Sequence, residues 1–202
     1  MDIMPKILNK VKAKNVLMRC KTILDKENIE FFLVQGTLLG CIREQNFISH
    51  DCDIDIAIFY TPLARMLTIA AMIKSGFMHE NTFSRGEEIC EDSFYWKDIK
   101  IDIFWYRAEA SRVYTHVFKG QVGKTWNEPL HAIVYEWKPF ALTTTQFLGF
   151  TFNVPDDTIE FLEAHYGKNW KKPDTKWEYW SSPINARQVS TDGHMKSWKG
   201  NK

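Results

Sequence analysis

Three aspartates alternate with small or apolar residues from Asp51 to Asp55, and a fourth, Asp102, stands between two isoleucines further along the chain. Strict alternation predicts a β-strand, on which side chains two residues apart project from the same face. The carboxylates of Asp51, Asp53 and Asp55 would then stand about 6.5–7 Å apart along the strand. Like charges at this spacing repel one another, and a divalent cation, which prefers oxygen ligands, would relieve that repulsion.

Asp102 lies in an expected strand with Lys100 and Phe104 on its own face. A carboxylate within so apolar a strand has to be paired or bound to a metal. Two carboxylates from one strand and a third from its neighbour can hold Mg²⁺ or Mn²⁺ against the phosphates of a nucleotide. The two acidic segments together therefore predict a centre for phosphoryl transfer.

The acidic run has two other interpretations. An edge strand could present the same residues as a solvated stripe with no ligand, and the strand alone does not exclude this. A helix–loop–helix calcium loop needs glycine at its sixth position and glutamate at its twelfth. Counted from Asp51, those positions hold Ile56 and Pro62, which argues against the calcium loop.

Gly36 marks a second feature with chemical meaning. The apolar segment 31–34 predicts a short buried strand, and residues 37–43 predict a short helix that begins at this glycine. Free N–H groups at such a start can bind an anion, although a plain helix start with a permissive residue explains the glycine equally well. Because Gly36 lies one strand before the carboxylates, we expect a phosphate and a metal to meet in one cleft.

The order of these motifs resembles the LicD/fukutin family of phosphotransferases. The segments that carry the resemblance are 36–43 (GTLLGCIR), 47–48 (FI), 50–55 (HDCDID), 147–149 (FLG), 154–155 (VP) and 166–170 (YGKNW), followed by Pro173. The resemblance implies a nucleotidyltransferase-like core that uses Mg²⁺ or Mn²⁺. It also implies transfer of a phosphorylated alcohol, such as choline phosphate or ribitol phosphate, from a CDP-linked donor to a hydroxyl of a cell-surface glycan or its precursor, with release of CMP.

Roles for individual residues follow from the resemblance by position. Asp53, Asp55 and Asp102 would bind the metal, and Asp51 would complete the catalytic group of four acids. Coupled carboxylates around a metal share protons, so the one that accepts the proton of the acceptor hydroxyl stays open.

The phosphate side of the donor would be lined by Gly36, Thr37 and Arg43. Two positions depart from the family pattern: His50 stands where many relatives carry Trp, and Cys52 where acidic or aromatic residues are common. Neither departure removes a metal ligand, and both leave the choice of alcohol open.

Composition limits the class of protein. The chain has 202 residues, a net charge of +1 and no stretch of about 18 apolar residues. This predicts no nucleic-acid partner and no integral membrane segment. The N-terminus lacks the apolar core of a signal peptide, and the four cysteines form no CxxC pair, so a cytoplasmic location is expected, at or near the inner face of a membrane. The expected partners are a CDP-activated alcohol and a glycan or lipid-linked glycan.

The apolar spacing predicts an α+β fold, with a mixed sheet, flanking helices and additional antiparallel strands. Residues 1–173 would form one catalytic domain, and residues 174–202 an irregular, polar, Trp-containing tail. Helices are expected at 7–28, 37–43, 63–75 and 155–165, and strands at 31–34, 51–58, 77–83, 94–97, 100–106, 113–118, 132–137 and 147–154.

Two other functions remain open. A nucleotidyltransferase with the same core would move a nucleoside monophosphate from a triphosphate onto a small molecule or a protein, releasing pyrophosphate instead of CMP. A non-catalytic module would bind metal and glycan only, although it would have no need for four clustered acids.

Overall fold

The computed structural model describes residues 7–119 and 129–198. Its helices are α1 (Lys10–Lys26), α2 (Gln35–Glu44), α3 (Pro62–Lys74) and α4 (Thr158–Tyr166). Its strands are β1 (Phe32–Leu33), β2 (Asp53–Phe59), β3 (Met78–Arg85), β4 (Glu88–Trp96), β5 (Ile99–Ala108), β6 (Val113–Lys119), β7 (Leu130–Trp137), β8 (Leu142–Phe147), β9 (Phe150–Pro155) and β10 (Ala186–Ser197). Among these helices, none is both long enough and apolar enough to cross a membrane.

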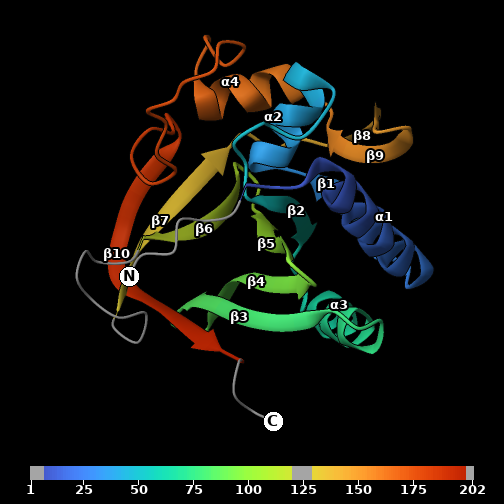
Figure 1. The fold of residues 1–202 in the computed structure, drawn as a ribbon. Helices are drawn as coiled ribbons and strands as arrows, with labels where there is room; N and C mark the ends of the chain where they lie inside the picture. The colour runs from blue at the N-terminus through green and yellow to red at the C-terminus, as the bar shows by residue number, and fades with distance from the viewer. Residues whose placement is uncertain (1–6, 120–128, 199–202) are drawn as a thin grey trace.

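The described strands form one mixed sheet, and part of it closes on itself (Figure 1). The order is β4-β3-β10-β7-β6-β5-β2-β1-β9-β8, and β4 also pairs with β5. Strands β3, β4, β5, β6, β7 and β10 therefore make a ring in which every pairing is antiparallel. The other strands extend from β5, beginning with β2, which runs parallel to it. The expected α+β fold with a mixed sheet and flanking helices is confirmed.

Helices α1 and α3 begin where the sequence provides capping groups. The side chain of Asn9 accepts a hydrogen bond from the N–H of Lys12, and that of Thr61 accepts one from Ala64. Such caps satisfy N–H groups that have no partner within the helix. Pro62 occupies the first turn of α3, as its fixed φ favours.

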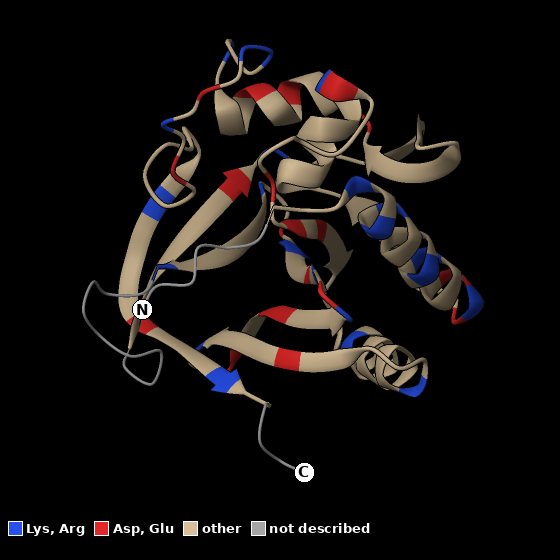
Figure 2. Ribbon diagram, viewed as in Figure 1, with Lys and Arg blue, Asp and Glu red and all other residues tan. Residues whose placement is uncertain are grey.

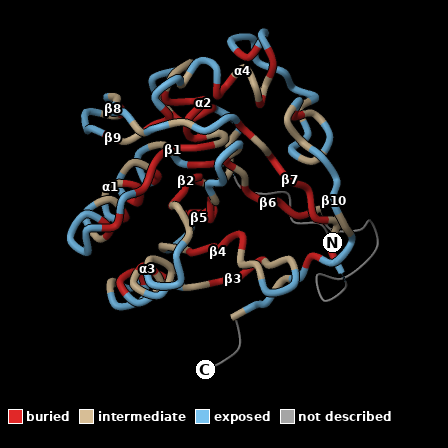
Figure 3. The backbone as a smooth tube through the Cα atoms, turned by 180° about the vertical axis from the view of Figure 1, so that it is seen from behind, coloured by how far each residue is buried: buried red, intermediate tan, exposed pale blue. Residues whose placement is uncertain are grey.

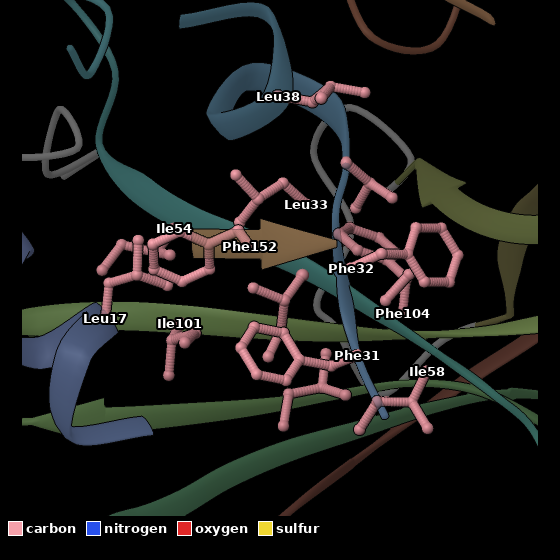
Figure 4. Close-up of a cluster of buried hydrophobic side chains, with 14 of the residues drawn as sticks. Leu17, Phe31, Phe32, Leu33, Leu38, Ile54, Ile58, Ile101, Phe104 and Phe152 are labelled. Carbon is pink, nitrogen blue, oxygen red and sulfur yellow. The ribbon is translucent and has the colours of Figure 1, made fainter. Parts of the chain in front are cut away.

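The core fills the space between α1 and the central strands. Leu17 of α1 is fully buried, as are Ile54 of β2 and Ile101 of β5, which belong to the same cluster (Figure 4). Figure 3 shows the same pattern along the chain, with buried central strands and an exposed outer side of α1. Burying alternate isoleucines of β2 leaves its acidic positions on the other face.

The expectation of an irregular segment beyond residue 173 is wrong for residues 186–197. These residues form β10, which lies between β7 and β3 and pairs with both. Most of its side chains are polar and exposed, so the strand lacks the alternation that predicts burial. Hydrogen bonding along both of its edges, which the local sequence does not reveal, explains its formation.

The single strand expected at 147–154 is also wrong, because these residues include a turn. Leu148 and Gly149 both have positive φ, of 53° and 87°, and they connect β8 to β9 as a hairpin. Leucine rarely adopts a positive φ, so residue type alone favours a continuous strand here.

Candidate metal and phosphoryl-transfer site

The parallel pairing of β2 with β5 brings the predicted acids together. Its register places Asp53 opposite Lys100 and Asp55 opposite Asp102, so all four side chains project from one face. Oxygen atoms of Asp53, Asp55 and Asp102 lie within 4.8 Å of one another. Figure 2 shows acidic and basic positions next to each other on the central strands. The structure thus gathers the three predicted metal ligands.

Asp51 joins the group from outside the strand. The expectation that it lies on the same strand as Asp53 is wrong, because β2 begins at Asp53. The carbonyl of Asp51 accepts a hydrogen bond from the N–H of Leu8 instead, at 2.8 Å. Its side chain nevertheless reaches the site: a methyl group built on Gly36 would lie 2.5 Å from Asp51 Oδ2 and 3.3 Å from Asp55 Oδ2. The start of α2 therefore contacts both carboxylates.

Burial, together with repulsion from nearby carboxylates, raises the pKa values of Asp51, Asp53 and Asp55. Burial is the larger cause for Asp53, with Asp102 next, and its pKa rises to about 7. Burial raises the pKa of Asp51 to about 6 against a lowering hydrogen bond from the N–H of Cys52. Asp55 has its pKa held well above the usual range by burial and by the other three acids. The group therefore favours protons or a metal at neutral pH.

A divalent metal fits the arrangement. Asp51 Oδ2 and Asp102 Oδ1 are buried and have no hydrogen-bond partner among the described residues. Buried carboxylate oxygens without a donor are costly, and Mg²⁺ and Mn²⁺ bind oxygen ligands of this kind. Asp53, Asp55 and Asp102 would hold the ion, with Asp51 beside them.

Glu91 is a further acid on this face, and sequence reasoning missed it. On β4, Ser93 stands opposite Asp102, and Glu91 lies two residues before it. The hydroxyl of Ser93 donates to Glu91 Oε1 at 3.1 Å. Burial, and next the charge of Asp102, raise the pKa of Glu91 to about 8. Two acids adjoin in the sequence here, and nothing in the sequence tells which of them faces the site.

The neighbouring acid, Asp92, projects from the opposite face of the sheet and stabilises the fold. Its fully buried carboxylate accepts hydrogen bonds from Arg65 Nε at 2.7 Å and from Trp105 Nε1 at 2.9 Å, and contacts His79 Nε2 at 2.9 Å. Although burial alone would raise it, these donors hold the pKa of Asp92 below its usual value. Asp92 thereby ties α3 to the sheet.

Tyrosine side chains border the acidic group. Burial is the main cause that raises the pKa values of Tyr106 and Tyr166, and the charge of Asp55 adds to both. The Tyr106 hydroxyl is buried without a hydrogen-bond partner among the described residues. Tyr135, whose pKa is also raised by burial and by Asp55, lies in the same region. The hydroxyl of Tyr135 donates a hydrogen bond to the carbonyl of Tyr179 and is therefore already used within the fold.

Comparison with known proteins places the chain in a family. A family model described as LicD/FKTN/FKRP, nucleotidyltransferase domain, matches residues 28–157, which contain all four predicted acids. The chain belongs to this family. The resemblance drawn from the sequence motifs is thereby confirmed.

Several proteins share this similarity with the chain. A Macaca fascicularis protein named ribitol-5-phosphate transferase FKTN is 32% identical over 176 residues, which are 87% of this chain and 36% of that protein. Its Homo sapiens counterpart is 31% identical, with the same shares. An uncharacterized protein of Rickettsia prowazekii is 26% identical over 151 residues, covering 74% of this chain and 52% of the relative. The chain thus spans about a third of the length of the FKTN relatives.

The residues that this LicD-family chain was expected to use for the donor phosphates lie in different places. Gly36 is at the acidic group. Thr37 is fully buried, and its hydroxyl accepts a hydrogen bond from the N–H of Asp55 at 2.8 Å. Arg43 lies in the last turn of α2, roughly 10 Å along the helix axis from Gly36. Its guanidinium donates to Glu44 and to the carbonyl of Trp170. The described contacts of Thr37 and Arg43 are therefore structural.

A second cluster of metal-type side chains, Glu88, Cys90 and His116, lies apart from the four acids. Arg107 Nη1 stands 3.2 Å from Glu88 Oε1, and His116 Nδ1 stands 3.4 Å from the same atom. Burial opposes ionisation of Glu88, but His116 and Arg107 outweigh it and lower the pKa of Glu88. A guanidinium already balances this carboxylate, so the cluster is better explained as an ion-pair network than as a metal site.

Proposed function

We propose that this LicD-family chain transfers a phosphorylated alcohol from a CDP-linked donor to a hydroxyl of a glycan or glycan precursor, in a reaction that requires Mg²⁺ or Mn²⁺. The observation that carries the proposal is the convergence of Asp53, Asp55 and Asp102 within 4.8 Å, inside the segment that matches the family. The name of the FKTN relatives, ribitol-5-phosphate transferase, supports ribitol phosphate as one candidate group.

A nucleotidyltransferase-like core is part of the proposal. Asp53, Asp55 and Asp102 stand on two adjacent parallel strands, and Gly36, the second residue of α2, lies against Asp51 and Asp55. N–H groups at a helix start favour an anion, so the donor diphosphate would lie between this start and the acids. A bound divalent metal would withdraw charge from the phosphate that is transferred.

The proposed reaction exchanges one bond to phosphorus for another. The acceptor oxygen forms a bond to the phosphorus that carries the alcohol, and the bond from that phosphorus to CMP breaks. The proton of the acceptor hydroxyl passes to a carboxylate of the site, and CMP leaves with the electron pair. The acids of the site are Asp51, Asp53, Asp55, Asp102 and Glu91. The raised pKa values of Asp51, Asp53, Asp55 and Glu91 suit acceptance of a proton near neutral pH.

Thermal unfolding with Mn²⁺, CDP, both together, or ATP instead of CDP tests ligand choice, on the wild type and Asp53→Asn. A ligand at about a hundred times its dissociation constant adds roughly 2.7 kcal/mol to the free energy of unfolding. We expect CDP to stabilise the wild type only together with Mn²⁺, and Asp53→Asn to lose the effect. Stabilisation by ATP but not by CDP would favour nucleotidyl transfer instead.

Product analysis tests the reaction. The wild type is incubated with Mn²⁺, CDP-ribitol or CDP-choline, and a glycan acceptor, and CMP is measured. We expect CMP to accumulate only with the acceptor that fits, and its production to cease in Asp53→Asn. Release of pyrophosphate from a nucleoside triphosphate would contradict this proposal, and binding without any turnover would favour a non-catalytic module.

A further inference from the structure

Lys100 is placed among the acids by the pairing of β2 with β5. Its Nζ lies 2.7 Å from Asp102 Oδ2 and 4.0 Å from Asp53 Oδ2. Only about a quarter of the lysine side chain is exposed, and the side chain of Asp102 is 5% exposed. The ammonium thus lies inside the acidic group and joins the two strands that carry it.

Lys100 brings a positive charge into the site. A lysine ammonium is ordinarily charged at neutral pH, and here its Nζ contacts the carboxylate of Asp102 directly. The site therefore already contains one cation before any metal binds.

Lys100 and a metal would use different oxygens of Asp102. The ammonium binds Oδ2, whereas the buried Oδ1 has no hydrogen-bond partner among the described residues. A Mg²⁺ or Mn²⁺ ion held by Oδ1 would therefore share the carboxylate of Asp102 with the ammonium. Enzymes with two metals hold them roughly 3.5–4 Å apart, and a cation on the other oxygen of the same carboxylate would stand in the neighbourhood of a second ion.

We infer that Lys100 is a built-in second cation, so that the site binds one divalent metal and the lysine ammonium replaces the other. This inference rests on the proposed metal-dependent function. An ammonium has three N–H groups, and one of them is used by Asp102. The remaining N–H groups can donate to a phosphate oxygen of the donor, on the side of the site where Asp53 stands opposite Lys100.

The test counts metal ions. Mn²⁺ is titrated into the wild type, Lys100→Met and Lys100→Arg at saturating CDP, and bound Mn²⁺ per chain is measured by equilibrium dialysis. Electron paramagnetic resonance of the same samples reports whether two ions are spin-coupled. Lys97→Met is the matched control, because Lys97 is an exposed lysine three residues away.

We expect one Mn²⁺ per chain in the wild type, Lys97→Met and Lys100→Arg, and two spin-coupled ions in Lys100→Met. Two ions in the wild type would overturn this inference alone, a result that does not depend on any variant folding. One ion in a folded Lys100→Met would also overturn it and leave the proposed function intact. No bound Mn²⁺ in the wild type would overturn the metal-dependent function together with this inference.

Discussion

Gly36 stands so close to Asp51 that a single added methyl group would lie 2.5 Å from the carboxylate oxygen Oδ2. The same methyl group would lie 3.3 Å from Asp55 Oδ2. This contact, and not a need for positive φ, explains the glycine at the second residue of α2. The first turn of α2 therefore packs directly against the carboxylates of Asp51 and Asp55, so a change in the position of one affects the other.

Gly36→Ala is expected to weaken metal binding more than it weakens the fold. The side chain of Asp51 can rotate away from the new methyl group, which moves one acid out of position. Displacing a group that supports a metal typically lowers affinity about 10–100-fold. Calorimetric titration with Mn²⁺ measures the affinity, and urea unfolding in EDTA measures the free energy of unfolding.

Gly40→Ala, in the same helix, is the comparison variant for that experiment, because it should affect the fold and not the acidic site. Its methyl group would lie 2.5 Å from the backbone carbonyl of Asn46, which cannot rotate away. We expect Gly40→Ala to lower the unfolding free energy. Equal Mn²⁺ affinity in Gly36→Ala and the wild type would contradict the close coupling of Gly36 to the acids.

Without metal, the protein is expected to lose stability as the pH rises from 6.5 to 8.5. The pKa values of Asp53 and Glu91 are raised to about 7 and about 8, so the folded protein still holds protons that the unfolded chain has released. Under this condition stability falls with pH. Urea midpoints in EDTA at pH 6.5, 7.5 and 8.5 measure the trend, which Asp53→Asn should reduce. Added Mn²⁺ should stabilise most at pH 8.5, where no protons compete.

His165 is expected to make stability depend on pH in the opposite direction, below pH 6.5. Burial is the main cause that lowers its pKa from 6.5 to about 4, and Nδ1 lies 2.9 Å from Asn185 Oδ1. Between pH 6.5 and pH 4, the imidazole of His165 is therefore protonated in the unfolded chain and neutral in the folded protein. Stability that is present above pH 6.5 is lost as the pH falls towards 4, by roughly 3 kcal/mol. Comparing the urea midpoints of the wild type and His165→Phe from pH 4 to 7 isolates the contribution of His165 to the pH dependence of stability. The same pH dependence in both proteins would contradict the prediction.

Removing the charge of Glu91 and removing that of the adjacent Asp92 should change the free energy of unfolding in opposite directions. Asp92→Asn breaks a buried network with Arg65, and removal of one partner from such a pair costs roughly 3–5 kcal/mol. Glu91→Gln removes a charge that burial disfavours, so at pH 8.5 in EDTA we expect a higher unfolding free energy and a weaker affinity for Mn²⁺. Unfolding and Mn²⁺ titration of both variants test this, and a destabilised Glu91→Gln would refute it.

The convergence of Asp53, Asp55 and Asp102 could be predicted because these residues lie on strands with strong apolar alternation. Ile54 and Ile56 alternate with the acids, so their burial determines the face on which Asp53 and Asp55 lie. Glu91 could not be predicted in the same way, because a bulge between β3 and β4 and the adjacent Asp92 hide its orientation. β10 was missed because its polar residues are held by two neighbouring strands and not by burial.

The position of β10 also determines the order in which the protein can be completed. The six-stranded ring has a gap between β7 and β3 until residues 186–197 occupy it. β3 is made about a hundred residues earlier, so this edge of β3 stays unpaired until β10 has been made. Pairing between segments so far apart in sequence is slow, because the closure of a long loop costs entropy before any contact compensates for it. On the ribosome, the carboxylate strands can therefore pair early, whereas the sheet that surrounds them closes only after residue 197 has emerged.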